Sequence, residues 1–412
     1  MSHSTVTPAG MGSATTTPAI GQSRGQVTEI VQRLRDGDLG VLPVVVGLLL
    51  IGAFFATQSD AFLTSRNFSN LLLQMAGIAT ISFGSVLVLL LGEVDLSAGP
   101  LSAFAAAVMG ILVTNQGWPA PLAILAALAV GCVCSLITGI VVTRLGVPSF
   151  VVTLGASLAY TGLVLIVLGT EGNVYISDST IVGIANTFMP AAVSWLILAL
   201  ALAGYAWLRF DLRRRRARLE LSNPSLLGDV VRIALPAVIG AIFVAVLNAA
   251  LGVPLVALIV GALVIGLQYL TVHRRFGRHL YAVGGDHESS RRLGIPVGRI
   301  RLVGFALAST LAAAGGVILA SRGASVTTAS GGGDLTLNAI AAAVVGGVSL
   351  FGGVGRIWQA LLGALVISVT LNGMDLLAVS SGTKYVVIGS ILVISVSIDA
   401  FSRNRRKAAG RV

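Results

Sequence analysis

The sequence predicts an all-α fold, a polytopic transmembrane helical bundle of about 10 to 12 spans with some segments broken or re-entrant. Three observations predict this class. Hydrophobic residues make up 55% of the 412 residues, and charged residues only 10%. The mean hydropathy is +0.93. Apolar runs also follow one another along most of the chain with short polar stretches between them, which excludes a soluble fold.

The N-terminal region differs from the rest of the chain. Residues 1–40 are rich in Ser, Thr, Gly and Ala and lack an early apolar core, so we expect a disordered cytoplasmic tail and not a cleavable signal peptide. Residues 27–35 place apolar side chains at helical spacing, namely Val27, Ile30, Val31 and Leu34. This spacing predicts a short amphipathic helix on the membrane surface.

Twelve apolar runs define the transmembrane domain, which we expect over residues 41–402, before a basic cytoplasmic tail at 403–412. They lie at 41–57, 70–91, 100–115, 122–143, 149–169, 191–208, 233–251, 254–272, 302–320, 337–351, 358–377 and 384–400. The runs 100–115 and 337–351 are shorter than the roughly 17 to 25 residues of a full span. We therefore expect them to be tilted, broken or re-entrant.

Basic residues indicate the orientation. With the N-terminus inside, only Arg66, Arg322 and Lys384 of the 27 basic residues fall outside. Both termini are then cytoplasmic. This topology accounts for the net charge of +11, so a nucleic-acid partner is not implied.

Two places interrupt the apolar sequence. Residues 92–100 carry two carboxylates, Glu93 and Asp95, and residues 346–355 are too rich in glycine for a continuous helix. Each is followed by a helix of small residues. This parallel indicates two related halves with broken helices, an arrangement that places a transport pathway at their junction.

The longest polar stretch between apolar runs is basic and covers residues 274–301, within a cytoplasmic loop expected at 273–301. Asp286 is a good N-cap, Glu288 falls in the first turn, and Gly294 can supply a left-handed C-cap. With Arg291 and Arg292 in the last turn, these signals predict a helix of about two turns, too short to be stable unless it is docked. The alternative is an ordinary solvated loop.

Enzyme and pump signatures are missing. Neither lysine follows a glycine, so there is no phosphate-binding GxxxxGK[ST] loop, and His287-Glu288 lacks the second histidine of a zinc-protease HExxH. We expect no catalytic residues and no metal site. Cys132 and Cys134 lie inside an apolar run, and we interpret them as packing residues. Only three acids interrupt or border the apolar runs, which gives an ion-coupled carrier little support: Glu93, Asp95 and Asp375.

Four stretches together resemble the membrane permease subunits of bacterial ABC importers for pentoses and related monosaccharides. GEVDLSAG at 92–99 is similar to that family's G-[EG]-[IV]-D-L-S-V-G, and VPSFVVTLG at 147–155 to its P-[SP]-F-I-V-T-L-G. GRHLYAVGGDHESSRRLGI at 277–295 and LNAIAAAVVGGVSLFGGVG at 337–355 match its loop and glycine-rich motifs. The likeness runs in order from about residue 41 to 400.

The apolar pair 191–208 and 233–251, with arginines between, resembles the extra segment of the xylose-type branch. The chain also departs from the family pattern. Asp286 replaces the usual Asn, and Glu288-Ser289-Ser290 replaces Glu-Ala-Ala; both changes keep a helix cap and small residues. Asn338 replaces the usual acid, which leaves the sugar open.

The resemblance implies a homodimeric permease in the bacterial plasma membrane, with a separate ATP-binding subunit that holds ATP and Mg²⁺ and a soluble sugar-binding protein outside. This chain itself would bind no cofactor. D-xylose or a related pentose is the expected substrate, and arabinose, ribose or galactose, an ion-coupled secondary carrier, and a non-transporting scaffold remain the alternatives. The residues expected to couple to the ATPase are Arg278, Tyr281, Gly284, Gly285, Asp286, Glu288, Arg291, Arg292, Leu293 and Gly294.

The expected pathway or gate residues are Glu93, Asp95, Ser97, Asn338, Asn372 and Asp375. Asp95 and Ser97 would lie near the cytoplasmic mouth, although Asp95 could equally cap the helix that begins near Gly99. Asn372 and Asp375 would lie toward the outside, where they could equally be solvated residues at the end of a span.

Overall fold

The protein is described by a computed structural model over residues 42–219 and 226–408. The longer helices are α2 (Leu42–Gln58), α3 (Ser65–Leu90), α4 (Ala98–Thr114), α5 (Ala120–Arg144), α6 (Ser149–Leu168), α8 (Ala191–Arg218), α9 (Leu226–Asn248), α10 (Leu255–His273), α13 (Val297–Gly323), α14 (Gly333–Val345), α15 (Ile357–Leu376) and α16 (Ser381–Ala408). The shorter ones are η1 (Gly169–Glu171), α7 (Ser179–Asn186), α11 (Arg275–Gly285) and α12 (His287–Arg292).

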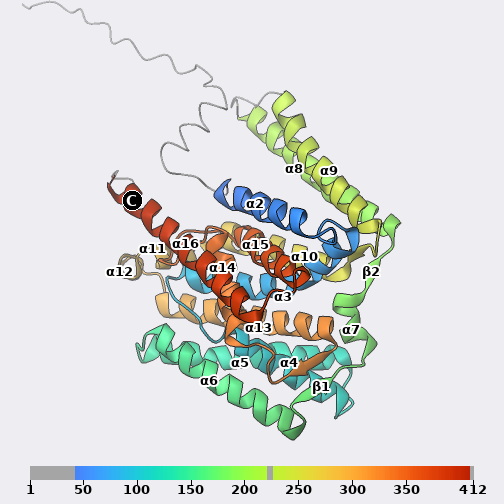
Figure 1. Ribbon diagram of the computed structural model, residues 1–412. Coiled ribbons are helices and arrows are strands. Elements are labelled where there is room, and N and C mark those ends of the chain that lie inside the picture. Colours follow the sequence, from blue (N-terminus) through green and yellow to red (C-terminus); the bar gives the residue numbers. More distant parts are fainter. Residues whose placement is uncertain (1–41, 220–225, 409–412) are drawn as a thin grey trace, which may run out of the picture.

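Helices α3 and α13 form the centre of the bundle. They pack against each other; α13 also packs against α4 and α5, and α3 against α14 and α15 (Figure 1). Lipid is as apolar as leucine, so small residues must supply the close packing between such helices. At Gly84 of α3 an added Cβ would lie 2.5 Å from the carbonyl oxygen of Ala308 on α13. The two backbones are therefore in direct contact there.

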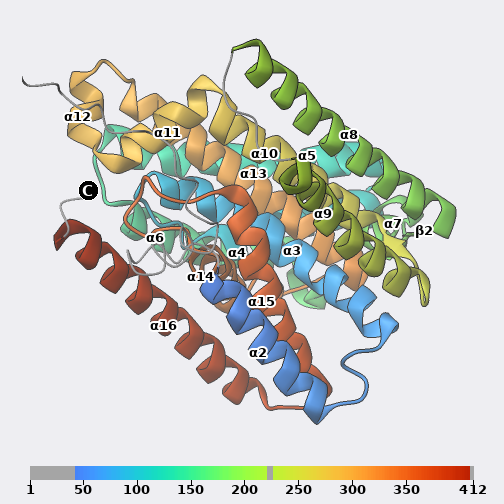
Figure 2. The same cartoon turned by 90° about the horizontal axis from the view of Figure 1, so that it is seen from above.

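Two short antiparallel strand pairs close one face of the bundle. β1 (Asn173–Tyr175) pairs with β4 (Ser325–Thr327), with Val174 opposite Val326, and β2 (Phe188–Met189) pairs with β3 (Val253–Pro254). Helix α7 lies at this face as well, whereas α11 and α12 lie at the opposite end of the molecule (Figure 2). Each face thus has its own set of short elements outside the long helices.

The twelve predicted apolar runs each coincide with a helix. Within the two described ranges, nine helices are long and apolar enough to cross a membrane, and α2, α4 and the apolar part of α14 are shorter apolar helices. The run 337–351 is indeed broken, because α14 ends at Val345 and the glycine-rich residues that follow are not helical. At 13 residues α14 is about 20 Å long, too short for a full span.

Other expectations need correction or fall outside the described residues. The sequence prediction did not include α7 or α11. The C-terminal tail expected from residue 403 begins as a continuation of α16, which extends to Ala408. The predicted tail 1–40 and its amphipathic helix lie outside the described residues.

Candidate functional site

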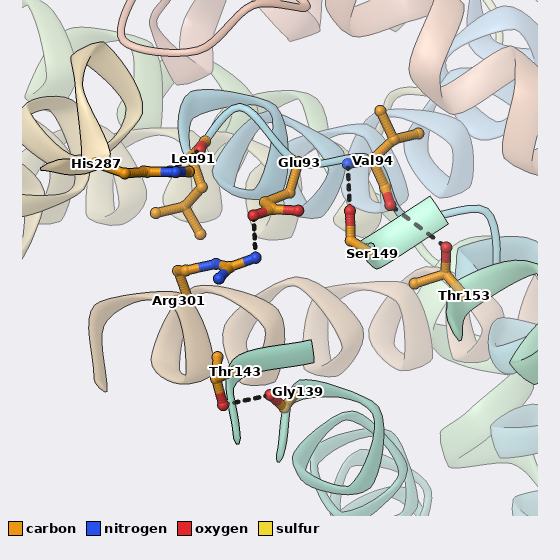
Figure 3. Close-up of polar contacts among 9 residues, drawn as sticks. All are labelled: Leu91, Glu93, Val94, Gly139, Thr143, Ser149, Thr153, His287 and Arg301. Carbon is orange, nitrogen blue, oxygen red and sulfur yellow. Dashed lines mark hydrogen bonds and ion pairs between the residues drawn. The ribbon is translucent and has the colours of Figure 1, made fainter. Parts of the chain in front are cut away.

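A non-helical segment, residues 91–97, separates α3 from α4 and forms the centre of the candidate site. Its carboxylate Glu93 forms an ion pair with Arg301 in the first turns of α13 (Figure 3). The Glu93 side chain is 10% exposed and that of Arg301 is 20% exposed. Replacing one partner of a pair this buried destabilises the protein, because the remaining charge would have little water to solvate it.

Polar side chains of α6 form hydrogen bonds with the backbone of residues 91–97. The Val94 N–H donates to Ser149 Oγ at 3.4 Å (Figure 3). The Leu96 N–H donates to Thr153 Oγ1 at 3.1 Å. The Thr153 hydroxyl in turn donates to the Val94 carbonyl at 3.3 Å. A non-helical backbone inside a membrane protein requires such partners, so the VPSFVVTLG stretch is explained as the support of residues 91–97.

The polar segment between α10 and α13 contacts the same place. His287 of α12 lies with its Nε2 atom 3.0 Å from the carbonyl oxygen of Leu91 (Figure 3). A Cβ on Gly284 of α11 would collide with the carbonyl oxygen of Leu90. The Tyr281 hydroxyl donates to the carbonyl oxygen of Gly355 at 2.6 Å. Helices α11 and α12 are therefore fastened to the end of α3.

The glycine-rich loop 346–355 completes the cluster. The Gly353 N–H donates to the Leu90 carbonyl at 3.0 Å, and a Cβ on Gly352 would collide with the carbonyl oxygen of Gly284. Gly352 and Gly353 have φ of +87° and +69°, which favours glycine at both positions. The two interruptions of the apolar sequence, far apart along the chain, thus meet at the end of α3 and are joined there by α11.

The predicted short helix is confirmed as α12. The Asp286 carboxylate accepts from the N–H groups of Glu288 at 2.9 Å and Ser289 at 3.1 Å, and the Ser289 hydroxyl donates to it at 2.6 Å. The Ser289 hydroxyl and N–H and the Glu288 N–H hold the pKa of the Asp286 carboxyl below its ordinary value. Gly294 has φ of +80°, as a left-handed C-cap requires.

One side of α12 is exposed. Glu288, Arg291 and Arg292 are exposed, and Leu293 is 81% exposed. Glu288 and Arg292 form an exposed ion pair at 3.3 Å. The helix therefore presents charges and one apolar side chain outward.

Gly284 and Gly285 both belong to helix α11, and neither has a positive φ. Gly284 serves close packing, and Gly285 has no heavy atom within 4 Å of an added Cβ. Tyr281 is half-buried with its hydroxyl bonded inside the protein, so it holds α11 in place, whereas the neighbouring Arg278 is exposed. Buried Leu280 and Val283, at spacing i, i+3, were the signal that could have revealed α11.

The predicted pathway residues fall into two groups. Asp95 and Ser97 belong to residues 91–97, where the Asp95 carboxylate accepts from the Ser97 N–H at 2.8 Å and from its hydroxyl at 2.6 Å. Asp95 therefore orders the turn before α4 and does not cap the helix directly. Asn338 is buried in α14, two residues after Thr336, whose hydroxyl oxygen accepts from the Gly99 N–H at 2.9 Å.

Asn372 and Asp375 lie at the opposite face and are not brought near α11 and α12. Asn372 is buried and exchanges two amide hydrogen bonds with Asn67 of α3, at 2.8 and 3.0 Å. It is therefore not a solvated residue at a helix end. Asp375 is half-exposed and pairs with Lys384, and Gln74 donates to it at 3.3 Å.

A feature that the sequence did not reveal is a cavity of about 120 Å³ between α4, α13 and the loop after β4. Ser102, Ser325 and Ser330 line it together with Gly316 and Gly331. No metal centre accompanies it. Within residues 42–219 and 226–408 no three His, Cys, Asp or Glu side chains form a group that could hold a metal ion.

Comparison with known proteins extends the sequence resemblance. A family model described as branched-chain amino acid transport system / permease component matches residues 67–396. The xylose transport system permease protein XylH of Escherichia coli strain K12 is 36% identical over 373 residues, which cover 90% of this chain and 94% of that protein. XylH of Haemophilus influenzae is 35% identical, over 90% of this chain and 99% of that protein. The ribose import permease protein RbsC of E. coli is 31% identical, over 86% and 92%. No solved structure gives a significant match.

Proposed function

Because this chain belongs to the branched-chain amino acid transport system / permease component family, we propose that it is the membrane permease subunit of an ATP-driven importer of a monosaccharide, with D-xylose as the first substrate to test. The 36% identity to a xylose permease over 90% of the chain carries this proposal. A separate ATP-binding subunit hydrolyses ATP with Mg²⁺, a soluble sugar-binding protein delivers the sugar, and two copies of this chain form the pathway.

The coupling step follows from the contacts of α12. Its exposed side, with Glu288, Arg291 and Leu293, docks on the ATP-binding subunit. Its inner side moves residues 91–97 through the contact between His287 and Leu91. Because Glu93 pairs with Arg301, the first turns of α13 move with the segment. Motion at the ATPase thus reaches both central helices without passing through a flexible loop.

The face that carries α11 and α12 is the cytoplasmic one in this proposal. A cysteine-free protein with Glu171→Cys should react with an impermeant thiol reagent added outside intact cells, because Glu171 is exposed on the opposite face. A cysteine-free protein with Arg299→Cys should not react until the cells are opened. The reverse pattern would invert the orientation and contradict ATPase docking on α12.

Reconstitution tests the function itself. Proteoliposomes with this chain, its ATP-binding subunit and the sugar-binding protein should accumulate labelled xylose only when ATP is supplied, with ribose and fructose as comparison sugars. Liposomes with this chain alone should take up none under a proton or sodium gradient. Uptake by the chain alone would contradict the proposal and indicate an ion-coupled carrier. If the complete complex takes up none of the sugars, the chain is a non-transporting scaffold.

A further inference from the structure

Helices α8 and α9 form a hairpin that stands at the edge of the bundle (Figures 1 and 2). The two helices pack on each other, with Leu198 of α8 against Gly240 of α9. Their outer surfaces are apolar and exposed, including Leu200 at 63% and Ile239 at 59%. In a membrane protein such surfaces face the acyl chains of the lipid.

The hairpin ends in a cluster of arginines around one carboxylate. Asp229 of α9 accepts from Arg209 and from Arg213 of α8, each at 2.8 Å. Arg216 and Arg232 line the same recess, which holds about 90 Å³. Neither of these two has a carboxylate partner among the described residues. Among the residues that the structure describes, the four arginines of the recess are accompanied by one aspartate, which leaves three positive charges uncompensated there.

The level of this cluster in the membrane follows from helix length. The apolar part of α8, residues 191–208, spans about 27 Å at 1.5 Å per residue, close to the thickness of the hydrocarbon layer. Trp195 and Trp207, 42% and 68% exposed, lie near its two ends, where aromatic side chains meet the interface. The arginines beginning at Arg209 therefore lie at the level of the lipid phosphates.

We propose that this cluster binds the headgroup of an anionic phospholipid with two phosphate groups, of the cardiolipin class. Arginine guanidinium groups bind phosphate through paired hydrogen bonds, and Asp229 fixes Arg209 and Arg213 in advance. Arg216 and Arg232, which have no carboxylate partner within the described part of the chain, are the cations that a second phosphate would neutralise. The exposed apolar surfaces of α8 and α9 continue directly from the recess and accommodate the acyl chains, which favours a lipid over a soluble acidic partner.

Native mass spectrometry of the purified full-length permease in detergent, titrated with cardiolipin, tests the proposal. An Arg216→Gln/Arg232→Gln variant should bind cardiolipin about thirtyfold more weakly than the unmodified protein. Each arginine near an anionic lipid surface contributes about 1 kcal/mol, which corresponds to roughly a fivefold change in affinity. The pair with Asp229 remains intact in this variant. An Arg214→Gln/Arg218→Gln variant, which removes the same number of charges from α8 outside the recess, should bind like the unmodified protein.

Several results would overturn the proposal. One is equal loss of binding in both double variants, which would mean that only bulk charge matters. Another is competition by inorganic phosphate, which would identify a phosphate site without lipid. A third is an unchanged affinity for cardiolipin in Arg216→Gln/Arg232→Gln together with lost co-purification of the ATP-binding subunit, which would assign the cluster to a protein partner. Thermal unfolding of each variant in detergent shows that it is folded before binding is compared.

Discussion

The most apolar windows of α3 and α8 are equally hydrophobic and the two helices are similar in length, yet they occupy opposite environments. In the most apolar window of α3, 94% of the residues are buried, compared with 6% in α8. Helix α3 contacts α13, α14 and α15, whereas α8 lies against α9 at the edge of the bundle. Hydropathy therefore predicts that a helix enters the membrane, but not whether protein or lipid surrounds it.

Small and polar residues make the difference. The buried surface of α3 includes Thr80, Ser82, Gly84 and Ser85, and the Thr80 hydroxyl bonds within its own helix to Ala76 at 2.8 Å. These side chains let neighbouring backbones approach closely. In α8 the only buried residue is Ser194, although seven alanines and Gly204 stand among its large side chains. The central helix is thus distinguished by small polar residues within its apolar sequence, and the following predictions test the contrast between the two regions.

The largest effect is expected where the interior holds a charge. Glu93→Gln leaves Arg301 without its counter-ion at a site where the two side chains are 20% exposed or less, and should lower the free energy of unfolding by about 3 kcal/mol. The matched change on α8 is Asp211→Asn, which breaks an exposed ion pair with Arg215 and should cost about 0.5 kcal/mol or less. Thermal and denaturant unfolding in detergent measure both.

A double variant sharpens this first test. Glu93→Gln/Arg301→Gln removes both charges and should recover part of the lost stability, because no buried charge then remains unpaired. If Glu93→Gln and Asp211→Asn cost the same, the end of α3 is as well solvated as the surface of α8, and the contrast between the two regions fails.

The next effect concerns packing. Gly84→Ala in α3 places a methyl group 2.5 Å from the backbone of α13 and should destabilise the protein by about 1 to 3 kcal/mol. Gly204→Ala in α8 meets nothing within 4 Å and should be neutral or slightly stabilising, since alanine favours a helix over glycine. Melting temperatures of the two variants, purified side by side, give the comparison. Equal melting temperatures would contradict the contact between α3 and α13.

The same contrast exists within helix α11 at two adjacent glycines. Gly284→Ala would collide with the carbonyl oxygen of Leu90 and should detach α11 from α3, at a cost of about 1 to 2 kcal/mol and with loss of ATP-driven uptake. Gly285→Ala has free space and should transport normally. The measurement is uptake in proteoliposomes containing the complete complex. Normal uptake by Gly284→Ala would show that α11 does not transmit motion to α3.

Much of this structure could be predicted from the sequence because its signals are local. The apolar runs fixed the number and position of the long helices, and Asp286 and Gly294 marked the ends of α12. The glycine-rich residues after Val345 were correctly expected to break a helix. Caps, glycines and long apolar runs depend only on neighbours along the chain.

The rest depends on residues far apart in the sequence. Nothing near Gly284 indicates that it contacts Leu90, and nothing near Glu93 identifies Arg301 as its partner. Asn372 was expected toward the outside, as a pathway residue or equally as a solvated residue at the end of a span, yet it is buried against Asn67. Helix α7 was predictable in part, since Asp178 accepts from two N–H groups of its first turn, but eight residues are too few for a clear hydrophobic period.

The smallest expected effect concerns the cap of α12 and its dependence on pH. Because hydrogen bonds from Ser289 and Glu288 hold the pKa of the Asp286 carboxyl below its ordinary value, the cap stabilises α12 above the ordinary Asp pKa and is lost as the pH falls through the lowered one. Hydrogen exchange at the Glu288 and Ser289 N–H groups should therefore accelerate, relative to unaffected amides, only under acidic conditions. In Asp286→Asn the amide oxygen still caps the helix but does not titrate, so this acidic acceleration should disappear. The same pH dependence in both proteins would show that a group other than Asp286 controls the stability of α12.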